Sequence, residues 1–251
     1  MEVVKDLILR IADDALMIGH RNSEWTGIGP ILEEDIAFSS MAQDKIGHSQ
    51  ALYNILHEEF QMNDPDHLAF RRNVKDFRSC HLVDLPIGDY AFTLVRHFFF
   101  DHAEALRYEA LCSSSFTPLA KLALKFKGEI KYHTLHADIW MKSLTLNGSE
   151  ESKARIQSAV NELYPYALGL FEPGINEQQL IDSKVFIGEA ALYNLWIQKV
   201  KDSFTQFNLI IPNVADNKIQ YGGRKGLHSQ YLSELVNEMT EVIRTDYEAE
   251  W

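Results

Sequence analysis

Two histidines stand where a metal-binding helix would place a ligand. A helix in a di-iron carboxylate site carries Glu-x-x-His, because side chains three residues apart project inward from one face of the helix. In the stretch QDKIGHSQ the residue three before His48 is Lys45, and in GEIKYH the residue three before His133 is Ile130. None of the ten histidines has a glutamate three residues earlier. The frame of a di-iron site is present, whereas its Glu-x-x-His ligands are absent.

Acidic residues accompany these two frames on the same helices and on the helices before them. The resulting positions of a degenerate metal site are Asp13, Asp14, Asp44, Lys45, His48, Asp101, Glu104, Glu129, Ile130 and His133. A lysine in an apolar interior is costly unless it is paired. We therefore predict that Lys45 is buried and forms an ionic network that replaces the metal. Its expected partners are Asp13 or Asp14, Asp44, Asp101 or Glu104. A single such group on a helix is otherwise an ordinary interior or surface residue.

An independent metal-dependent oxidase is the alternative interpretation of the same positions. Its reduced ligand set would be Asp44, His48, Asp101, Glu129 and His133. A cation close to the iron positions would repel a metal ion by several kcal/mol, as an order of magnitude, at low effective dielectric. Lys45 therefore argues against this alternative, and we predict no metal and no catalytic residue in this chain.

The elements that position these residues are helices, because most of the chain has apolar residues at helical spacing. We expect four helices in two pairs, followed by additional C-terminal helices. The expected ranges are 3–20, 31–60, 89–114, 117–146, 150–170, 183–204 and 229–244. Residues 63–87 are expected to be irregular or only briefly helical. Asp89 and Ser229 are expected to cap the helices that follow them, and Phe98–Phe100 is expected to lie in the core. The predicted fold is all-α, with a ferritin-like four-helix bundle core in a single domain over residues 1–251.

Two loops carry charged residues suited to contacts with other molecules. The first contains Arg21, Glu24 and Trp25, an aromatic residue among charges, which is typical of an interface anchor; a tryptophan packed against the end of the bundle is the equal alternative. The second, GGRKG, places Arg224 and Lys225 before a helix, where glycine-flanked basic residues can cradle a phosphate such as that of coenzyme A. A docking loop for a partner subunit is the interpretation favoured there.

The composition limits the partners and the location. A net charge of −12 lacks the basic surplus that nonspecific nucleic-acid binding requires. The N-terminal residues do not resemble a signal or transit peptide, and no run of 18 apolar residues predicts a membrane span. We expect a cytoplasmic protein whose two cysteines are reduced, structural thiols.

Four stretches together resemble a known family over nearly the whole chain. They are RNSEWTGIGPILEEDIAFSSMAQDKIGHSQALY, DYAFTLVRHFFFDHAEALRYEAL, GEIKYHTLHADIWMKSL and GGRKGLHSQYLSELVNEM. In this order they resemble the PaaC-type subunits of phenylacetyl-CoA ring 1,2-epoxidases. SEWTG and GGRKGLHS are the more specific pieces of the resemblance.

The resemblance implies a non-catalytic structural subunit of an oxygen- and NADPH-dependent monooxygenase complex of phenylacetate catabolism. The cofactors would lie elsewhere in the complex: a di-iron site in the catalytic PaaA subunit, and FAD with an iron–sulfur cluster in the reductase. The implied partners are PaaA, the other epoxidase components and a second copy of this chain.

Overall fold

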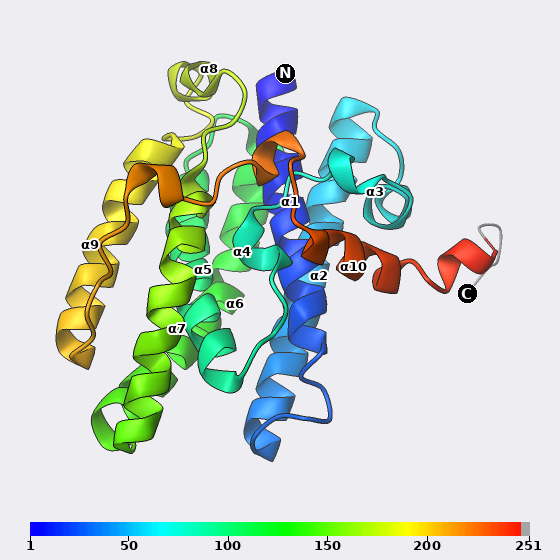
Figure 1. The fold of residues 1–251 in the computed structure, drawn as a ribbon. Coiled ribbons are helices and arrows are strands. Elements are labelled where there is room, and N and C mark those ends of the chain that lie inside the picture. The colour runs from blue at the N-terminus through cyan, green and yellow to red at the C-terminus, as the bar shows by residue number, and fades with distance from the viewer. Residues whose placement is uncertain (247–251) are drawn as a thin grey trace. The chain divides into compact units, whose positions relative to one another are not determined.

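Helices joined by loops make up the part of the chain that the computed structural model describes, which is residues 1–246 (Figure 1). The helices are α1 (Glu2–Ser23), α2 (Leu32–Phe60), α3 (Pro65–Phe70), α4 (His81–Asp84), α5 (Tyr90–Leu111), α6 (Thr117–Lys142), α7 (Glu150–Leu168), α8 (Glu177–Asp182), α9 (Glu189–Phe207) and α10 (Gln230–Met239). Short helical turns lie at Val74–Asp76, Ser143–Asn147, Gly169–Phe171, Asp216–Lys218, Gly223–Lys225 and Ile243–Thr245. No strand occurs within residues 1–246. The all-α prediction is confirmed.

The chain divides into two compact units. Unit 1 comprises Met1–Pro86 and the C-terminal segment from Gly222, and unit 2 comprises Ile87–Tyr221. Each unit is built on one of the helix pairs that the sequence predicts: α1 with α2 in unit 1, and α5 with α6 in unit 2. The single domain expected over residues 1–251 stays a prediction.

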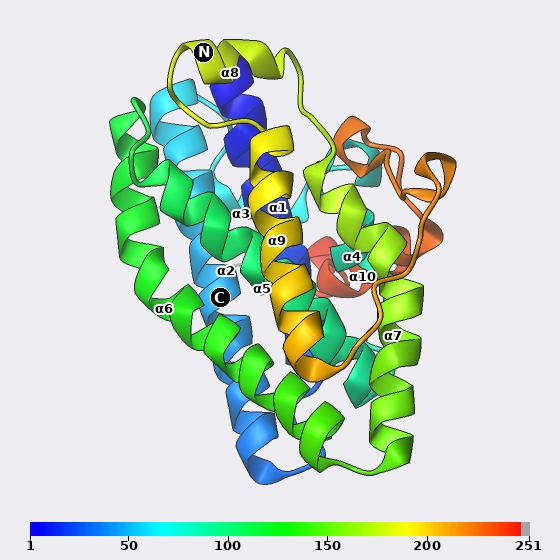
Figure 2. The ribbon, with the colours of Figure 1, turned by 90° about the vertical axis from the view of Figure 1, so that its left-hand side faces the viewer.

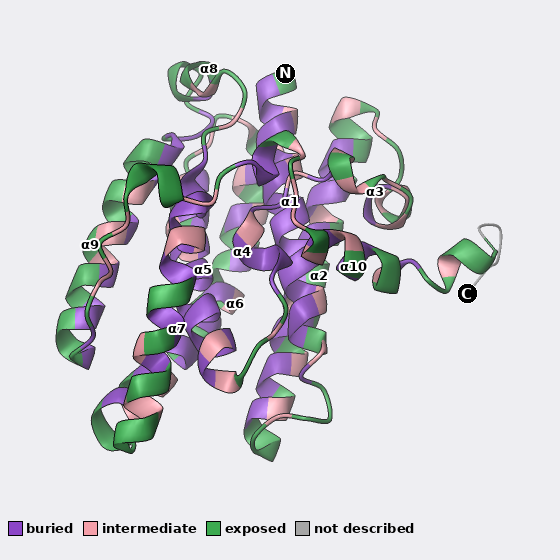
Figure 3. Ribbon diagram, viewed as in Figure 1, coloured by how far each residue is buried: buried purple, intermediate pink, exposed green. Residues whose placement is uncertain are grey.

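In unit 1 the helices α1 and α2 run antiparallel along most of their length (Figure 1). Helix α1 is buried along nearly its whole length, including its polar positions (Figure 3). It therefore needs covering on several sides, and α4 contributes to this cover. The segment between α2 and α5 was expected to be irregular or briefly helical, and this is confirmed by the short helices α3 and α4.

In unit 2 helix α5 is the central element and contacts α6, α7 and α9 (Figure 2). Its N-cap is Asp89, as predicted, because the Asp89 carboxylate accepts the N–H of Phe92. Phe98–Phe100 is buried, also as predicted. The ring of Phe99 packs against Trp196, whose indole N–H donates to the Phe99 carbonyl at 3.0 Å.

The C-terminal half departs from the predictions at two helix boundaries and at one helix cap. The helix expected over 183–204 is interrupted, and α9 begins only at Glu189, because Lys184 and Gly188 adopt left-handed backbone conformations (φ 58° and 90°) that end a helix. The last helix ends at Met239 rather than Arg244. Ser229 stands at the N-cap position of α10, but its side chain makes no capping hydrogen bond.

No helix within residues 1–246 is both long enough and apolar enough to cross a membrane.

Gly223 is required by close packing within unit 1. A Cβ atom at Gly223 would lie 2.1 Å from the carbonyl oxygen of Ser79, whereas a Cβ atom at Gly47, on α2, would meet no atom within 4 Å. We expect Gly223→Ala to lower the free energy of unfolding by about 2 kcal/mol or more, since the backbone must move. Gly47→Ala is the control and is expected to be neutral or stabilising by up to about 1 kcal/mol. Urea unfolding of both variants checks this, and equal effects would contradict it.

Candidate functional site

Unit 2 brings together three side chains that could hold a metal ion. Helix α5 supplies Asp101 and Glu104, which are three residues apart and share a face, and α6 supplies His133. One ligand atom from each lies within 4.8 Å of the others, and all three residues are buried. Asp101 is also hydrogen-bonded to Nδ1 of His97, one turn earlier on α5, at 2.9 Å. The sequence predicted these three positions, and the structure shows that they converge.

This set falls short of what a di-iron centre needs. Two carboxylates and one imidazole could hold a single divalent ion, whereas a di-iron centre takes a glutamate and a Glu-x-x-His pair from each half of the bundle. On α6 the glutamate position is occupied by Ile130, which is 1% exposed and has no ligand atom. Glu129 lies one residue off the inward face and is half-buried. The residues of unit 2 therefore do not fit half of a di-iron site.

In unit 1 the corresponding position of α2 is occupied by a buried cation. Lys45 is 0% exposed and His48, three residues later, is 1% exposed, so both point away from solvent. Asp44 is half-buried. An exposed Lys45 would have refuted the predicted ionic network, but the side chain is buried. The partners of its ammonium group stay a prediction. A buried ammonium group occupies the place where a di-iron site requires a carboxylate, so unit 1 does not fit the metal either.

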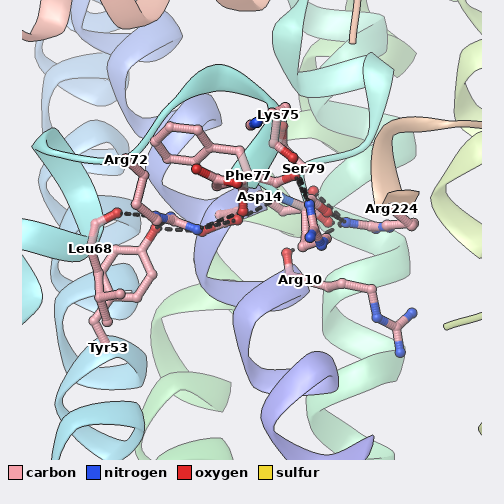
Figure 4. Close-up of polar contacts among 12 residues, drawn as sticks. Arg10, Asp14, Tyr53, Leu68, Arg72, Lys75, Phe77, Ser79 and Arg224 are labelled. Atoms are coloured by element: carbon pink, nitrogen blue, oxygen red, sulfur yellow. Dashed lines mark hydrogen bonds and ion pairs between the residues drawn. The ribbon is translucent and has the colours of Figure 1, made fainter. Parts of the chain in front are cut away.

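Asp13 is held by three hydrogen-bond donors of unit 1. Its carboxylate accepts hydrogen bonds from the Arg72 guanidinium, the Tyr53 hydroxyl and the backbone N–H of Arg78 (Figure 4). Burial and the Asp13 charge raise the pKa of the Tyr53 hydroxyl well above its usual value. The same carboxylate holds the pKa of Arg72 above its usual value despite burial of the guanidinium. Tyr53 is therefore a neutral donor and Arg72 a permanent cation in this cluster.

Asp14 is paired with Arg224 in a similar way. Both terminal nitrogens of Arg224 donate to the two carboxylate oxygens of Asp14 at 2.7 Å, and the N–H of Cys80 donates to Asp14 at 2.8 Å. Arg72 and Arg224 reach α1 from its two sides (Figure 4). Asp13 therefore pairs with Arg72 and Asp14 with Arg224, while the ionic partners of Lys45 stay a prediction. The two aspartates attach the segment after α2 and the GGRKG loop to α1.

The residues predicted to contact a partner or coenzyme A lie mainly inside unit 1. Arg21 is buried and donates to the carbonyl of Asp84 at 2.8 Å and to Glu24. Trp25 is 7% exposed and packs on Phe38, which matches the alternative of internal packing.

The GGRKG loop is likewise used internally. The guanidinium of Arg224 is committed to Asp14, so it is not available to a phosphate. Lys225 is exposed, whereas Glu24 is half-buried. A phosphate cradle in this loop is therefore not supported.

Arg224 was singled out from the sequence only as a possible partner or coenzyme A contact, and Arg72 and Arg78 were not singled out. Arg72 and Arg78 lie in the stretch RRNVKDFR. The sequence did contain a signal for these contacts. It has two adjacent acids on an otherwise largely apolar helix, and it has a basic stretch in a segment expected to be irregular. Such a coincidence predicts an ion pair, but it does not fix which residues meet.

His228 joins the same region of unit 1 through Asp84, and this gives a pH prediction. Burial opposes its positive charge, but the hydrogen bond and charge of Asp84 outweigh burial and raise the pKa of His228 above 6.5. The protonated form therefore stabilises the fold below pH 6.5, and this contribution is lost as the pH rises through the higher folded-state pKa. We expect the difference in unfolding free energy between the native protein and His228→Gln to shrink from about pH 5.5 to about pH 8.5. Urea titrations at each pH measure it, and a difference that grows with pH would contradict the assignment.

Two features define the class of protein: the helical fold, and a set of buried positions at which a di-iron site would have its ligands but where some of those ligands are replaced. This class is the ferritin-like all-α proteins, here with a lysine and an isoleucine at the two glutamate positions of the metal frame.

Residues 2–251 match the family described as phenylacetic acid catabolic protein, PaaA/PaaC, and the chain belongs to that family. It is 28% identical over 243 residues to the C-designated subunit of 1,2-phenylacetyl-CoA epoxidase from Escherichia coli (strain K12), with 97% of each chain covered.

Proposed function

We propose that this chain is a non-catalytic structural subunit of a phenylacetyl-CoA 1,2-epoxidase complex in aerobic phenylacetate catabolism, where it supports a di-iron catalytic PaaA subunit. The observation that carries the proposal is the pair of buried residues Lys45 and Ile130, which stand where the two Glu-x-x-His motifs require glutamate. The similarity to the Escherichia coli epoxidase subunit along 97% of both chains supports a place in such a complex. The complex would act in the cytoplasm and would draw electrons from a reductase carrying FAD and an iron–sulfur cluster.

The outer face of α6 supports a role in assembly. Four large apolar side chains on this helix are 48–63% exposed: Leu124, Tyr132, Leu135 and Ile139. Tyr132, Leu135 and Ile139 are spaced by three and four residues, so they form one stripe along the helix. A stripe of this kind is suited to a helix of a partner subunit. We propose that it contributes to binding of the PaaA-type subunit.

Co-expression tests this function. A tagged form of this chain is expected to co-purify with the PaaA-type subunit encoded by the same organism. We expect Leu135→Asp to reduce the recovered partner by about tenfold, because a charge would be placed within an apolar contact. Leu195→Asp on α9 is the matched control, since Leu195 is 51% exposed and Leu135 55%. Failure of the native chain to co-purify would overturn the proposed role, and equal effects of the two variants would overturn the α6 interface.

An independent ferritin-like oxidase is the second candidate, and the convergence of Asp101, Glu104 and His133 is the observation that favours it. Oxygen chemistry at this cluster would need a bound redox metal. The cluster offers such an ion three ligand atoms, two from carboxylates and one from an imidazole. Metal analysis of the isolated chain separates this candidate from the structural subunit.

A further inference from the structure

Unit 2 contains a cavity that the proposed subunit role does not use. Its volume is about 580 Å³, within the range of small-molecule sites. Helix α7, the turn Gly169–Phe171 and the first turn of α9 form one side of the cavity, and the segment 212–221 forms another. After the end of α9 the chain turns back, and the segment 212–221 follows this turn (Figures 1 and 2). The side-chain amide of Gln157 on α7 holds the turning chain in place through hydrogen bonds to both the N–H and the carbonyl of Ile210.

Four aromatic residues line the cavity: Tyr164, Phe171, Tyr193 and Tyr221. Ring packing in unit 2 sets the positions of the first three. Phe171 and Tyr193 pack edge to face at 5.5 Å, and Tyr164 stacks on Trp196 at 6.3 Å. Tyr221 is 47% exposed and stands at the open side. A rigid aromatic wall of this kind suits a ligand with a flat apolar body or a cationic group.

The charges of the lining are negative. Its ionisable side chains other than tyrosine are Glu177, Glu189 and Asp216, and no lysine or arginine is among the lining residues described. Glu189 is neutralised by a two-point ion pair with the buried Arg107. The Glu177 carboxylate accepts the N–H of Glu189 at 3.1 Å, which satisfies a donor at the start of α9. Asp216 lies on an exposed turn at the rim.

Burial and nearby carboxylates both act on the tyrosines of the cavity. Burial raises the pKa of Tyr221, and the charges of Glu172 and Asp216 raise it further. Burial and Tyr193 raise the pKa of Tyr164 to about 12. The charges of Glu172 and Asp216 oppose a carboxylate or phosphate ligand and favour a positive charge, whereas burial opposes a charge of either sign.

From this geometry we propose that the cavity binds an organic cation with an apolar body, such as an aryl-alkyl ammonium group. The aromatic wall would hold the apolar part, and Asp216 with Glu177 would attract the positive charge. The cavity is therefore distinct in chemistry from a site for an acyl-CoA, whose phosphates are anionic. The inference does not depend on the proposed role as an epoxidase subunit.

Binding of three matched compounds to the full chain tests the proposal. We would measure 2-phenylethylammonium, 2-phenylethanol and phenylacetate by isothermal titration calorimetry. These share a phenyl ring and a short chain and differ in charge. We expect the ammonium compound to bind at least about fivefold more tightly than the alcohol, and phenylacetate to bind most weakly. Equal binding of all three, tighter binding of phenylacetate, or no binding of the ammonium compound would overturn the proposal.

Two substitutions locate the site. Asp216→Asn is expected to weaken binding of the ammonium compound by about fivefold and to leave binding of the alcohol unchanged. Asp202→Asn on α9 is the matched control, because Asp202 is exposed and lies outside the cavity lining. An unchanged affinity of Asp216→Asn, or the same loss in both variants, would contradict the assignment of the cation to this cavity. Neither substitution removes a core side chain, and thermal unfolding verifies that both variants are folded.

The cation could be a free amine or a lysine side chain of a bound protein. Titration with Nα-acetyl-lysine methylamide distinguishes these sources. Tighter binding of the lysine derivative than of 2-phenylethylammonium would identify a protein side chain as the ligand. The reverse order would identify a free small molecule, and both results support a cation site.

Discussion

Arg224→Ala is expected to lower the free energy of unfolding by about 3–5 kcal/mol, because it leaves the buried carboxylate of Asp14 without its counter-charge. The two side chains are 2% and 9% exposed and pair through two hydrogen bonds of 2.7 Å. Arg224 also donates to the carbonyl of Arg78, so its removal frees the segment after α2 as well as the C-terminal loop. Chemical denaturation monitored by circular dichroism measures the change.

Lys225→Ala is the matched control for this prediction. It removes a positive charge from the adjacent residue of the same loop, but Lys225 is exposed. We expect this variant to change the unfolding free energy by no more than about 0.5 kcal/mol. If Arg224→Ala had an equally small effect, the Asp14–Arg224 pair would not be the contact that attaches the loop to α1.

Ile130→Glu is expected to create a metal site within unit 2. The new carboxylate would lie three residues before His133 on α6, beside the cluster of Asp101 and Glu104. Without metal the free energy of unfolding of the variant should be lower by about 3 kcal/mol or more, because the new carboxylate is buried beside the carboxylates of Asp101 and Glu104. Addition of Co²⁺ or Mn²⁺ should restore stability, because a fourth ligand completes a set suited to a divalent ion.

Ile130→Gln separates ligand chemistry from packing. Glutamine has nearly the same size as glutamate but carries no charge, so it should lose stability without regaining it on metal addition. We expect the metal affinity of Ile130→Glu to exceed that of Ile130→Gln by at least about tenfold, measured by thermal shift against metal concentration. Identical metal responses would show that Asp101, Glu104 and His133 are not arranged as a ligand set.

Helical periodicity was sufficient to predict the main elements. Amphipathic spacing and end signals such as Asp89 gave the two long helix pairs and their approximate ends. The interruption before α9 was missed because it depends on a left-handed conformation at Lys184, a residue type that rarely adopts one. Local pattern indicates where a helix is favoured, whereas tertiary packing decides where it ends.

The candidate site was predictable where it depends on position along one helix. The spacing of Asp101 and Glu104 and the substitution at Ile130 follow from periodicity alone. The partners of Asp13 and Asp14 were not predictable, because Arg72 and Arg224 come from an irregular segment and from a loop more than 200 residues away from Asp14 in the sequence. Charge complementarity indicates that such pairs form, but only the packing of the chain selects them.

Metal analysis of the native chain, purified alone from iron-supplemented cells, tests the central claim most directly. The proposed role as a silent subunit predicts less than about 0.1 equivalents of iron or manganese per chain, because Lys45 and Ile130 replace the two glutamates that an iron pair requires. About two equivalents of tightly bound iron per chain would contradict this role and would identify the protein as a metalloenzyme in its own right.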